Sequence, residues 1–265
     1  MWTALTLTTV MTLAPAQGIE LKNVRTTYGI MGETRKDDKL LPGDVLVVAF
    51  DIEGLKVKEN GLVQYSMGME LTKKGKAKPE FKQDPQDLEA ENSLGGTSLP
   101  AFANYLLPTD FATGEYTLKV TVKDRLGKTD KVFSKTFEVL PMKLGFVQVG
   151  LTTPQGFPAP PVAVPGQRVL VHYTLVGYKP GKDQQPNVTI EMVVQDDAGK
   201  PTVAKSFKSD ITAEPKATPG VMHFLARPLD LNKAGKYKIV MKATDNNTKD
   251  TTEQTLNLNV LAPAN

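Results

Sequence analysis

Residues 114–124, GEYTLKVTVKD, decide the fold of this chain, because they read as a single half-buried β-strand and then occur a second time. The second copy is residues 235–245, GKYKIVMKATD. In both copies a Gly-x-Tyr opening leads into strict alternation of apolar and polar residues. A side-chain period of two with one apolar face predicts an antiparallel strand that packs one face on a core. The duplication predicts two β domains of one repeated design.

Other strands recur with a similar separation. Apolar runs at residues 45–53 and 168–176 each follow a Pro-Gly turn, and residues 63–71 correspond to residues 188–194. Each copy closes with a further apolar strand, at residues 137–140 and 258–261. We expect about seven short strands per copy. Residues 79–100 read as an irregular region, with one short helical turn allowed at residues 85–92, and residues 203–207 read as a strand of the second copy.

Length and composition exclude several classes of protein. The chain has 265 residues, which suits two ordinary domains. It contains no cysteine, which rules out disulfides, thiol catalysis and thiolate metal sites. The net charge of +3 comes from 32 basic and 29 acidic residues spread along the chain, so no nucleic-acid footprint is expected. No segment after the first residues reaches the roughly 18 apolar residues of a membrane-spanning helix.

The first residues indicate export. Residues 1–16 are uncharged and largely apolar and end in Ala14-Pro15-Ala16, which predicts a signal peptide cleaved after Ala16. The basic residues usual at the start of a signal are missing, and an N-terminal β-strand is the alternative. The predicted organisation is a signal at 1–16, one domain at 17–140 and another at 143–265. The linker is so short that the two domains should touch.

At this point the chain resembles the tandem immunoglobulin-like or fibronectin-type-III-like β-sandwiches of bacterial secreted proteins, over nearly all of residues 18–261. The residues that carry the resemblance are the paired turns and paired tyrosines, Pro42-Gly43, Pro165-Gly166, Gly114-x-Tyr116 and Gly235-x-Tyr237. The tyrosines resemble the tyrosine corner of such domains. Antibody-type membership is not implied, because Leu118 and Ile239 stand where the second disulfide cysteine would be. The resemblance implies an all-β chain of two tandem immunoglobulin-like antiparallel β-sandwich domains.

Side chains that could carry chemistry are few and dispersed. His172 and His223 lie in separate strands and are expected at the surface or at a sheet edge. Met67 and Met69 share a strand face and are expected in the core. The acidic residues between 84 and 91 could supply a glycosidase pair, but such a pair needs aromatic platforms, and the only tryptophan, Trp2, lies in the predicted signal.

Asp124 and Asp245, which recur at the end of the Gly-x-Tyr strand, are candidate calcium ligands. Calcium prefers several oxygen ligands at loop positions. The favoured alternative is that each aspartate stabilises a turn through bonds to nearby backbone. No cofactor is predicted.

Two functions stay open. The favoured one is a non-catalytic exported module for binding, adhesion or scaffolding, whose partner is a protein or glycan of the cell envelope. The alternative is an enzyme or small-ligand or glycan carrier with an interdomain site. Strand parity places residues 26–39 opposite residues 177–183 and 245–247 across the junction. We therefore expect the junction to be a fixed elbow or a binding site, with Arg35, Asp37, Asp38, Tyr178 and Lys182 near it.

Overall fold

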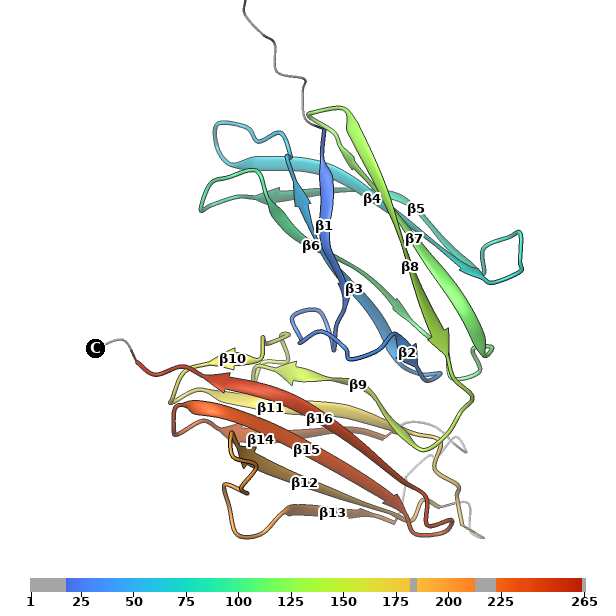
Figure 1. Cartoon of the computed structure of the whole chain (residues 1–265), viewed down its shortest axis with the longest axis vertical. Coiled ribbons are helices and arrows are strands. Elements are labelled where there is room, and N and C mark those ends of the chain that lie inside the picture. The colour runs from blue at the N-terminus through green and yellow to red at the C-terminus, as the bar shows by residue number, and fades with distance from the viewer. Residues whose placement is uncertain (1–17, 182–184, 213–222, 264–265) are drawn as a thin grey trace, which may run out of the picture.

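A computed structural model describes residues 18–181, 185–212 and 223–263. Within these ranges the regular secondary structure consists of β-strands, which form four sheets. The sheets pair into two sandwich-like halves (Figure 1). The predicted all-β fold of two tandem sandwiches is therefore confirmed. The predicted signal at residues 1–16 lies outside the described residues.

The first half contains β1 to β8. One sheet has the order β1-β3-β6 and the other the order β2-β8-β7-β4-β5. The strands are β1 (Glu20–Thr26), β2 (Lys39–Leu40), β3 (Val45–Glu53), β4 (Leu62–Lys73), β5 (Phe81–Glu91), β6 (Leu99–Leu106), β7 (Gly114–Asp124) and β8 (Thr129–Val139).

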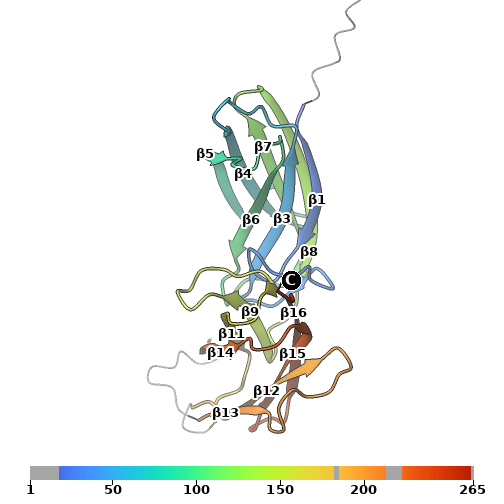
Figure 2. The ribbon, with the colours of Figure 1, turned by 90° about the vertical axis from the view of Figure 1, so that its left-hand side faces the viewer.

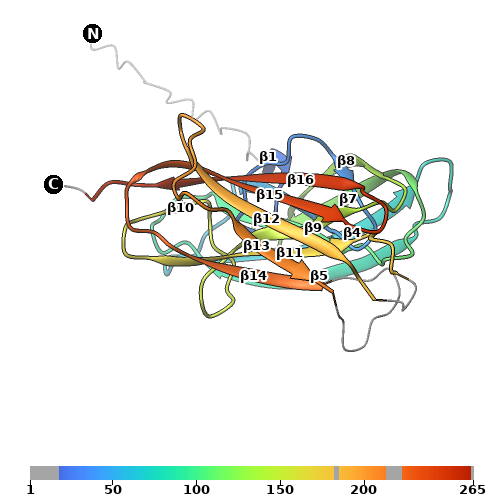
Figure 3. The same ribbon diagram turned by 90° about the horizontal axis from the view of Figure 1, so that it is seen from below.

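The second half repeats this order with β9 to β16. Its sheets are β14-β11-β9 and β10-β16-β15-β12-β13. Seen from below, β16, β15, β12 and β13 lie side by side in front of the smaller sheet (Figure 3). The strands are β9 (Gly145–Thr152), β10 (Val162–Ala163), β11 (Arg168–Val176), β12 (Val188–Asp196), β13 (Phe207–Ile211), β14 (His223–Asp230), β15 (Gly235–Asp245) and β16 (Thr251–Val260).

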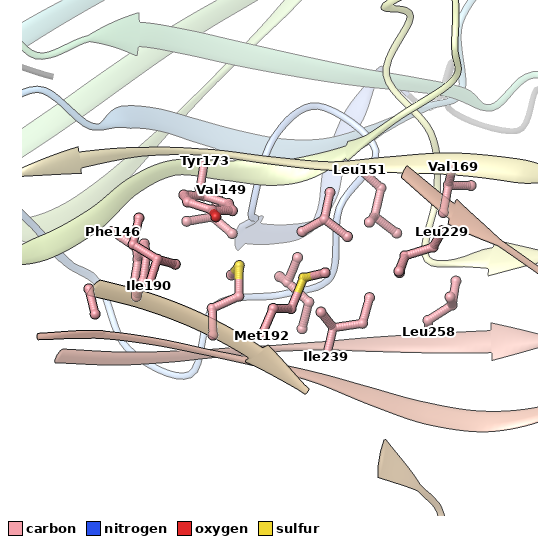
Figure 4. Packing of buried hydrophobic residues seen from close by; sticks show 14 of the residues in the cluster. Phe146, Val149, Leu151, Val169, Tyr173, Ile190, Met192, Leu229, Ile239 and Leu258 are labelled. Carbon is pink, nitrogen blue, oxygen red and sulfur yellow. The ribbon is translucent and has the colours of Figure 1, made fainter. Parts of the chain in front are cut away.

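Alternation along the strands builds a core in each half. In β7 the side chains of Tyr116, Leu118, Val120 and Val122 are buried, while their neighbours in sequence reach the surface. The core of the second half fills the space between its two sheets in the same way (Figure 4). Phe146 of β9 and Tyr173 of β11 meet edge to face there, with ring centroids 5.2 Å apart. Burial of such apolar side chains is the main term that stabilises each sandwich.

The repeat extends to backbone hydrogen bonds at the paired turns. Gly43 donates its N–H to Leu107 O at 3.1 Å, and Gly166 donates to Leu231 O at 2.7 Å. Both glycines have positive φ, 89° and 92°, which favours glycine at these positions. Each turn therefore ties the start of one strand to the end of its neighbour in the same sheet.

The first strand of each half carries a β-bulge. The pairing of β1 with β3 shifts between Lys22 and Arg25, and that of β9 with β11 shifts opposite Tyr173. The bulged residues, Asn23 and Gln148, have φ of 53° and 51°. A bulge redirects the side chain of the extra residue and often marks a functional edge.

The two halves meet at an angle. The lower end of the first half, where β3 begins and β6 and β8 end, rests on the side of the second half and not on one of its ends (Figures 1 and 2). The linker packs closely on the second half, since a Cβ added to Gly177 would lie 2.1 Å from Lys143 O. The chain therefore enters the second half in close contact with the segment after β11.

Three details of the strand prediction are wrong. The region 79–100 is not irregular, since β5 spans most of it, and no helical turn forms at residues 85–92. The short strands β2 and β10 were not expected. In the second half the strand predicted at residues 203–207 begins at Phe207. In β5, solvent exposure hides the alternation of apolar and polar residues, because six of its eleven residues are charged or proline.

Candidate functional site

A buried ion pair stands at the end of the first half that faces the second. Arg35 Nη2 lies 2.8 Å from Asp44 Oδ2, and the two side chains are only 8% and 4% exposed. Arg35 also donates from Nε to Thr27 O at 3.3 Å and stacks over the ring of Tyr28, 4.6 Å from its centroid. The segment between β1 and β2 is therefore held against the turn that starts β3.

Asp44 also bonds to the second half. Its Oδ1 accepts the N–H of Gln148 at 2.8 Å, and Gln148 Nε2 donates to Gly43 O at 2.9 Å. Gln148 is the bulged residue of β9, which is an edge strand. A carboxylate of one half thus covers an edge N–H of the other, and the bulge turns the glutamine side chain toward the same turn.

A second carboxylate makes a similar contact with the opposite sheet of the second half. Glu33 Oε1 accepts the N–H of Asn257 at 3.0 Å, and Glu33 Oε2 accepts from Asn257 Nδ2 at 2.5 Å. Asn257 belongs to β16, and the nearby ring of Tyr28 packs against the core of the second half. The first half therefore bonds to β9 and β16, one strand from each sheet.

A cleft of about 570 Å³ opens beside these contacts. Its walls are the outer faces of the two three-stranded sheets, and its rim is formed by the loops after β1 and after β9. A volume in this range suits a small ligand or a few residues of a partner. Residues from the first half are Tyr28, Gly29, Ile30, Met31, Gly32, Arg35, Asp44, Val45, Val47 and Asn104, and those from the second half are Gln148–Thr152, Pro154, Gln155, Gly156, Pro158, Ala159, Leu170, His172 and Ala226.

The lining is mainly apolar. Ile30 and Met31 are 38% and 49% exposed at the rim. Among the lining residues Arg35 and Asp44 carry charge, and they are paired with each other. His172 stands on the wall from β11, and burial lowers the pKa of its imidazole. A Cβ added to Gly150 would lie 2.8 Å from His172 Cε1, so glycine leaves room for this ring.

The structure brings one of the residues predicted near the junction into the cleft, namely Arg35. Asp37 Oδ1 accepts the N–H of Lys39 at 3.1 Å, on the surface. Asp38 accepts from Thr26 Oγ1 at 2.5 Å and lies 2.7 Å from Lys135 Nζ, within the first half. Partial burial alone would raise the pKa of Asp38, but the bonds from Lys135 and Thr26 outweigh it and lower the pKa.

Tyr178 is not where the parity argument placed it. Its side chain is 3% exposed and belongs to the core of the second half. Lys182 lies outside the described residues. Residues 26–39 do contact the second half, but they meet β9 and β16 along its side. In the described part of the chain, the bonds from residues 26–39 to the second half go to β16, and not to residues 177–181 or 245–247. Strand parity gives the order of the strands but not the tilt between the halves.

Asp124 and Asp245 bind backbone. Asp124 accepts the N–H groups of Lys56, Leu126 and Gly127 at 2.9 to 3.0 Å. Asp245 accepts the N–H groups of Lys179 and Asn247 at 2.8 and 2.9 Å. Both aspartates are 1% exposed. Asp124 connects the β7–β8 turn to the loop after β3, and Asp245 connects the β15–β16 turn to the loop after β11. No group of three or more acidic or histidine residues suited to a metal occurs in the described ranges.

The acidic residues considered as a glycosidase pair lie along the exposed edge strand β5. Asp84 pairs with Lys82, Asp87 pairs with Arg125, and Glu89 bonds to Gln64. None of them lines the cleft of about 570 Å³ between the halves. Met67 and Met69 pack against the core of the first half, where they were expected.

Both tyrosine corners are formed. Tyr116 Oη donates to Ala112 O at 2.7 Å, and Tyr237 Oη donates to Lys233 O at 3.0 Å. Tyr116 is 1% exposed, whereas Tyr237 is only half-buried. The expectation that both are buried is therefore wrong for Tyr237, which borders a second cleft of about 660 Å³ at the end of the second half.

Sequence reasoning missed Glu33, Asp44 and Gln148, which hold the junction. One signal was available: the paired turns read Pro-Gly-Asp at residues 42–44 and Pro-Gly-Gln at residues 165–167. Where two copies of a repeat differ at one polar position, that position is a candidate for a role outside the shared fold. The bulge of β9 has no comparable signal in the sequence.

Comparisons with known proteins assign no family. No family model and no curated protein matches the chain. Among solved structures, dimeric latent PorU from Porphyromonas gingivalis is 14% identical with a TM-score of 0.38, covering 94% of this chain and 21% of that one. The C-terminal domain of the Streptococcus pyogenes antigen I/II-family protein AspA is 9% identical with a TM-score of 0.31, covering 92% and 100%. Red sea bream transglutaminase is 9% identical with a TM-score of 0.29, covering 93% and 31%.

The chain spans 21% of the length of the PorU chain that it matches. At these TM-scores the likeness assigns no function. In the part of the chain that the structure describes, no helix is long and apolar enough to cross a membrane.

Proposed function

We propose that this chain is a non-catalytic, exported binding module, made of two immunoglobulin-like or fibronectin-type-III-like repeats, that holds a partner protein in the cleft between its halves. The observation that carries the proposal is the cleft of about 570 Å³ beside a junction where Asp44, paired with Arg35, also accepts the N–H of Gln148 from the second half. The common strand order of the halves and the two tyrosine corners support the immunoglobulin-like assignment.

The junction supports binding because it makes the cleft a preformed shape. A buried ion pair whose remaining lone pairs are satisfied resists removal of either partner. Asp44 meets this condition, since its second oxygen accepts N–H groups from Val45 and Gln148. A cleft that keeps its shape when empty loses less entropy when a partner binds.

The lining supports an apolar protein segment over a glycan. Glycan sites need aromatic platforms with polar groups around them. The lining has no tryptophan or phenylalanine, and its tyrosine, Tyr28, is covered by Arg35 and packs on the second half. Ile30 and Met31 instead offer flexible apolar side chains at the rim. Methionine adapts to partners of varied shape.

The alternative, an enzyme or small-ligand carrier, finds less support in the same lining. A general base needs an orienting group and a reacting partner within hydrogen-bond reach. The cleft offers the imidazole of His172 and the carboxylate of Asp44, and that carboxylate is committed to Arg35 and to backbone N–H groups. Replacing His172 with glutamine should therefore leave partner binding within about twofold of wild type.

The test is site-specific photo-crosslinking followed by measured binding. A photoreactive residue at Met31, on the rim, should give one reproducible adduct in the native host, and a photoreactive residue at Val132 should not. Val132 is a matched control, since it is exposed to a similar degree, 48%, on the opposite sheet of the first half. The adducted protein would then be purified and titrated against the chain by calorimetry.

A filling variant decides whether the cleft is the site. Ala226 is exposed and lines the cleft, so Ala226→Trp should fill it without disturbing either core. We expect the affinity for the crosslinked partner to fall at least tenfold, while Val132→Trp leaves it unchanged. Equal affinity for Ala226→Trp and wild type would reject the cleft as the site.

Export is tested separately. Cleavage after Ala16 would leave Gln17 as the new terminus, and the intact mass of protein from the native host would report it. A soluble cytosolic pool that retains Met1 would contradict export.

A further inference from the structure

Strand β6 is an exposed sheet edge without a charged residue or a bulge, and its single proline, Pro100, stands near its start. It forms one margin of the β1-β3-β6 sheet, and its sequence, LPAFANYL, contains no charged residue over eight positions. Proteins normally guard long edges with charges, prolines or bulges, because a free edge pairs with other strands. The edge strands β1, β5, β13 and β14 each carry charged residues, and β5 adds Pro85 and a bulge.

One other long edge strand lacks charge, and it is covered. Strand β9, GFVQVGLT, is the margin of the β14-β11-β9 sheet, and the first half lies against it through Asp44 and Gly43. The two uncharged edges therefore differ in one respect: β9 has a neighbour and β6 has none in the described part of the chain. Figure 2 shows β6 along the side of the first half, with its end directed at the loop after β9.

The backbone of β6 is oriented for pairing. Leu107 donates its N–H to Asp44 O at 2.9 Å, toward β3. Residues that face a neighbouring strand alternate in an antiparallel ladder. Ala103 and Tyr105 therefore face β3, while Phe102, Asn104 and Leu106 direct their N–H and C=O groups to the open edge.

The outer face beside this edge is apolar. Phe102 and Leu106 are 37% and 56% exposed, and their partners across the ladder are Ala49 and Val45. An added strand would cover these side chains as well as bond to the backbone. Its own residues must be uncharged, because a charge placed over this face would lose water without gaining a partner.

We propose that β6 pairs with β6 of a second copy of this chain, in an antiparallel two-fold dimer with one continuous sheet across both copies. A strand that pairs with itself places like residues near one another, so self-pairing suits a strand without charge. With Ala103 on the two-fold axis, Phe102 lies opposite Asn104 of the second copy and Leu106 lies opposite Pro100. Each outward N–H then meets a carbonyl, and Pro100, which has no N–H, leaves no donor unpaired.

The two-fold arrangement also explains why assembly stops at two copies. The opposite margin of the sheet is β1, which carries Glu20, Lys22 and Arg25 and a bulge at Asn23. A further copy has no uncharged edge left to pair with on that sheet. The dimer is a second interaction surface beside the cleft between the halves, and the two surfaces share Asn104.

The experiment is sedimentation velocity on the full chain from micromolar to millimolar concentration. Wild type should pass from monomer to dimer and form nothing larger. At high concentration the amides of Phe102, Asn104 and Leu106 should exchange more slowly with solvent than at low concentration. Wild type that stays monomeric throughout, or that grows without limit, would overturn the proposal, as would binding of a foreign strand without self-association.

Two variants of β6 and one control complete the test. Phe102→Lys places like charges close together across the two-fold axis, and Asn104→Pro removes an N–H that serves no bond within the monomer. Both should keep the thermal unfolding of wild type and remain monomeric. Val132→Lys introduces the same charge at an exposed apolar residue of the other sheet and should dimerise like wild type. Dimerisation of Asn104→Pro, or loss of dimer in Val132→Lys, would contradict pairing through β6.

Discussion

Each half has one end that carries its tyrosine corner. The two ends share the same backbone arrangement but differ in how tightly side chains pack around the tyrosine. In the first half Tyr116 stands in a row of rings, with Phe111 5.0 Å and Phe137 5.7 Å away between centroids. In the second half the position of Phe137 is taken by Leu258, by strand register, and Tyr237 borders an open cleft. The hydrogen bond of the corner is therefore independent of the packing around it.

The difference follows the position of each end in the molecule. The filled end carries Gly43 and Asp44, which bond to the second half. The open end has Gln167 in place of Asp44, and its side chain bonds back to Val164 N–H at 2.9 Å. A dense aromatic core holds side chains in fixed positions. In this molecule the dense aromatic packing lies at the end that holds the junction.

Removing Asp44 should have the largest effect. Asp44→Ala leaves the buried guanidinium of Arg35 without its partner, which costs about 3–5 kcal/mol of unfolding free energy. The equivalent change in the second half, Gln167→Ala, removes one exposed hydrogen bond and should cost about 0.5–1.5 kcal/mol. Urea denaturation of both variants measures the contrast, and similar losses would show that Asp44 has no special role.

Truncating the two tyrosines to alanine should distinguish the stability contributed by packing of the ring from that contributed by the hydrogen bond of the tyrosine corner. Tyr116→Ala opens a cavity in a dense core and should cost about 3–5 kcal/mol, by analogy with other aromatic truncations. Tyr237→Ala removes a half-buried ring beside a cleft and should cost clearly less. If urea denaturation gives equal losses of unfolding free energy for the two variants, the packing around Tyr116 adds no stability, and the aromatic end is not the more tightly packed one.

Tyrosine to phenylalanine changes give the complementary measurement. Tyr116→Phe and Tyr237→Phe each remove one hydrogen bond to a backbone carbonyl, at a cost of about 1 kcal/mol. The two costs should agree more closely than those of the alanine variants. If Tyr116→Phe costs as much unfolding free energy as Tyr116→Ala, the hydroxyl and not the packing of the ring accounts for the contribution of Tyr116.

Acid should act on the two halves in different ranges. Burial lowers the pKa of His172, so the unfolded chain takes up a proton that the folded chain resists, and the second half loses stability as pH falls below about 6.5. The bonds to Asp38 lower its pKa, so its contribution to the first half is present above about pH 3.9 and is lost as pH falls through the lowered value. His172→Gln should remove the histidine effect from a pH series of melting curves.

Calcium should have the smallest effect. The carboxylates of Asp124 and Asp245 already accept backbone N–H groups, and a cation would have to displace these donors. Melting temperatures with millimolar calcium and with chelator should therefore agree. A calcium-dependent rise in melting temperature that Asp245→Asn abolishes would show that the aspartates bind calcium, and would contradict their role as acceptors of backbone N–H groups.

The sequence predicted the parts of the fold that repeat. The Gly-x-Tyr strands, the Pro-Gly turns and the Asp turns appear where the alternation placed them, because these features depend on local backbone geometry and burial. Strand β5 was missed because an exposed edge strand needs no apolar face, and its charges and proline resemble a loop. Short strands such as β2 carry too few residues to show a period.

The junction could be predicted only in part. That residues 26–39 touch the second half follows from chain direction and the short linker. The partners could not be predicted, because they depend on the tilt between the halves, which turns Asp44 and Glu33 toward β9 and β16. Strand parity placed Tyr178 in the junction with its loop, yet its ring belongs to the core of the second half.

The central claim is that carboxylates of the first half fix the angle between the halves, and the distance between spin labels tests it most directly. The chain has no cysteine, so Lys123→Cys and Lys242→Cys, both exposed, would label one site in each half. Double electron–electron resonance should give one narrow distance distribution, and adding Asp44→Ala should broaden it while adding Gln167→Ala should not. A broad distribution in the labelled chain without further changes would contradict a fixed elbow.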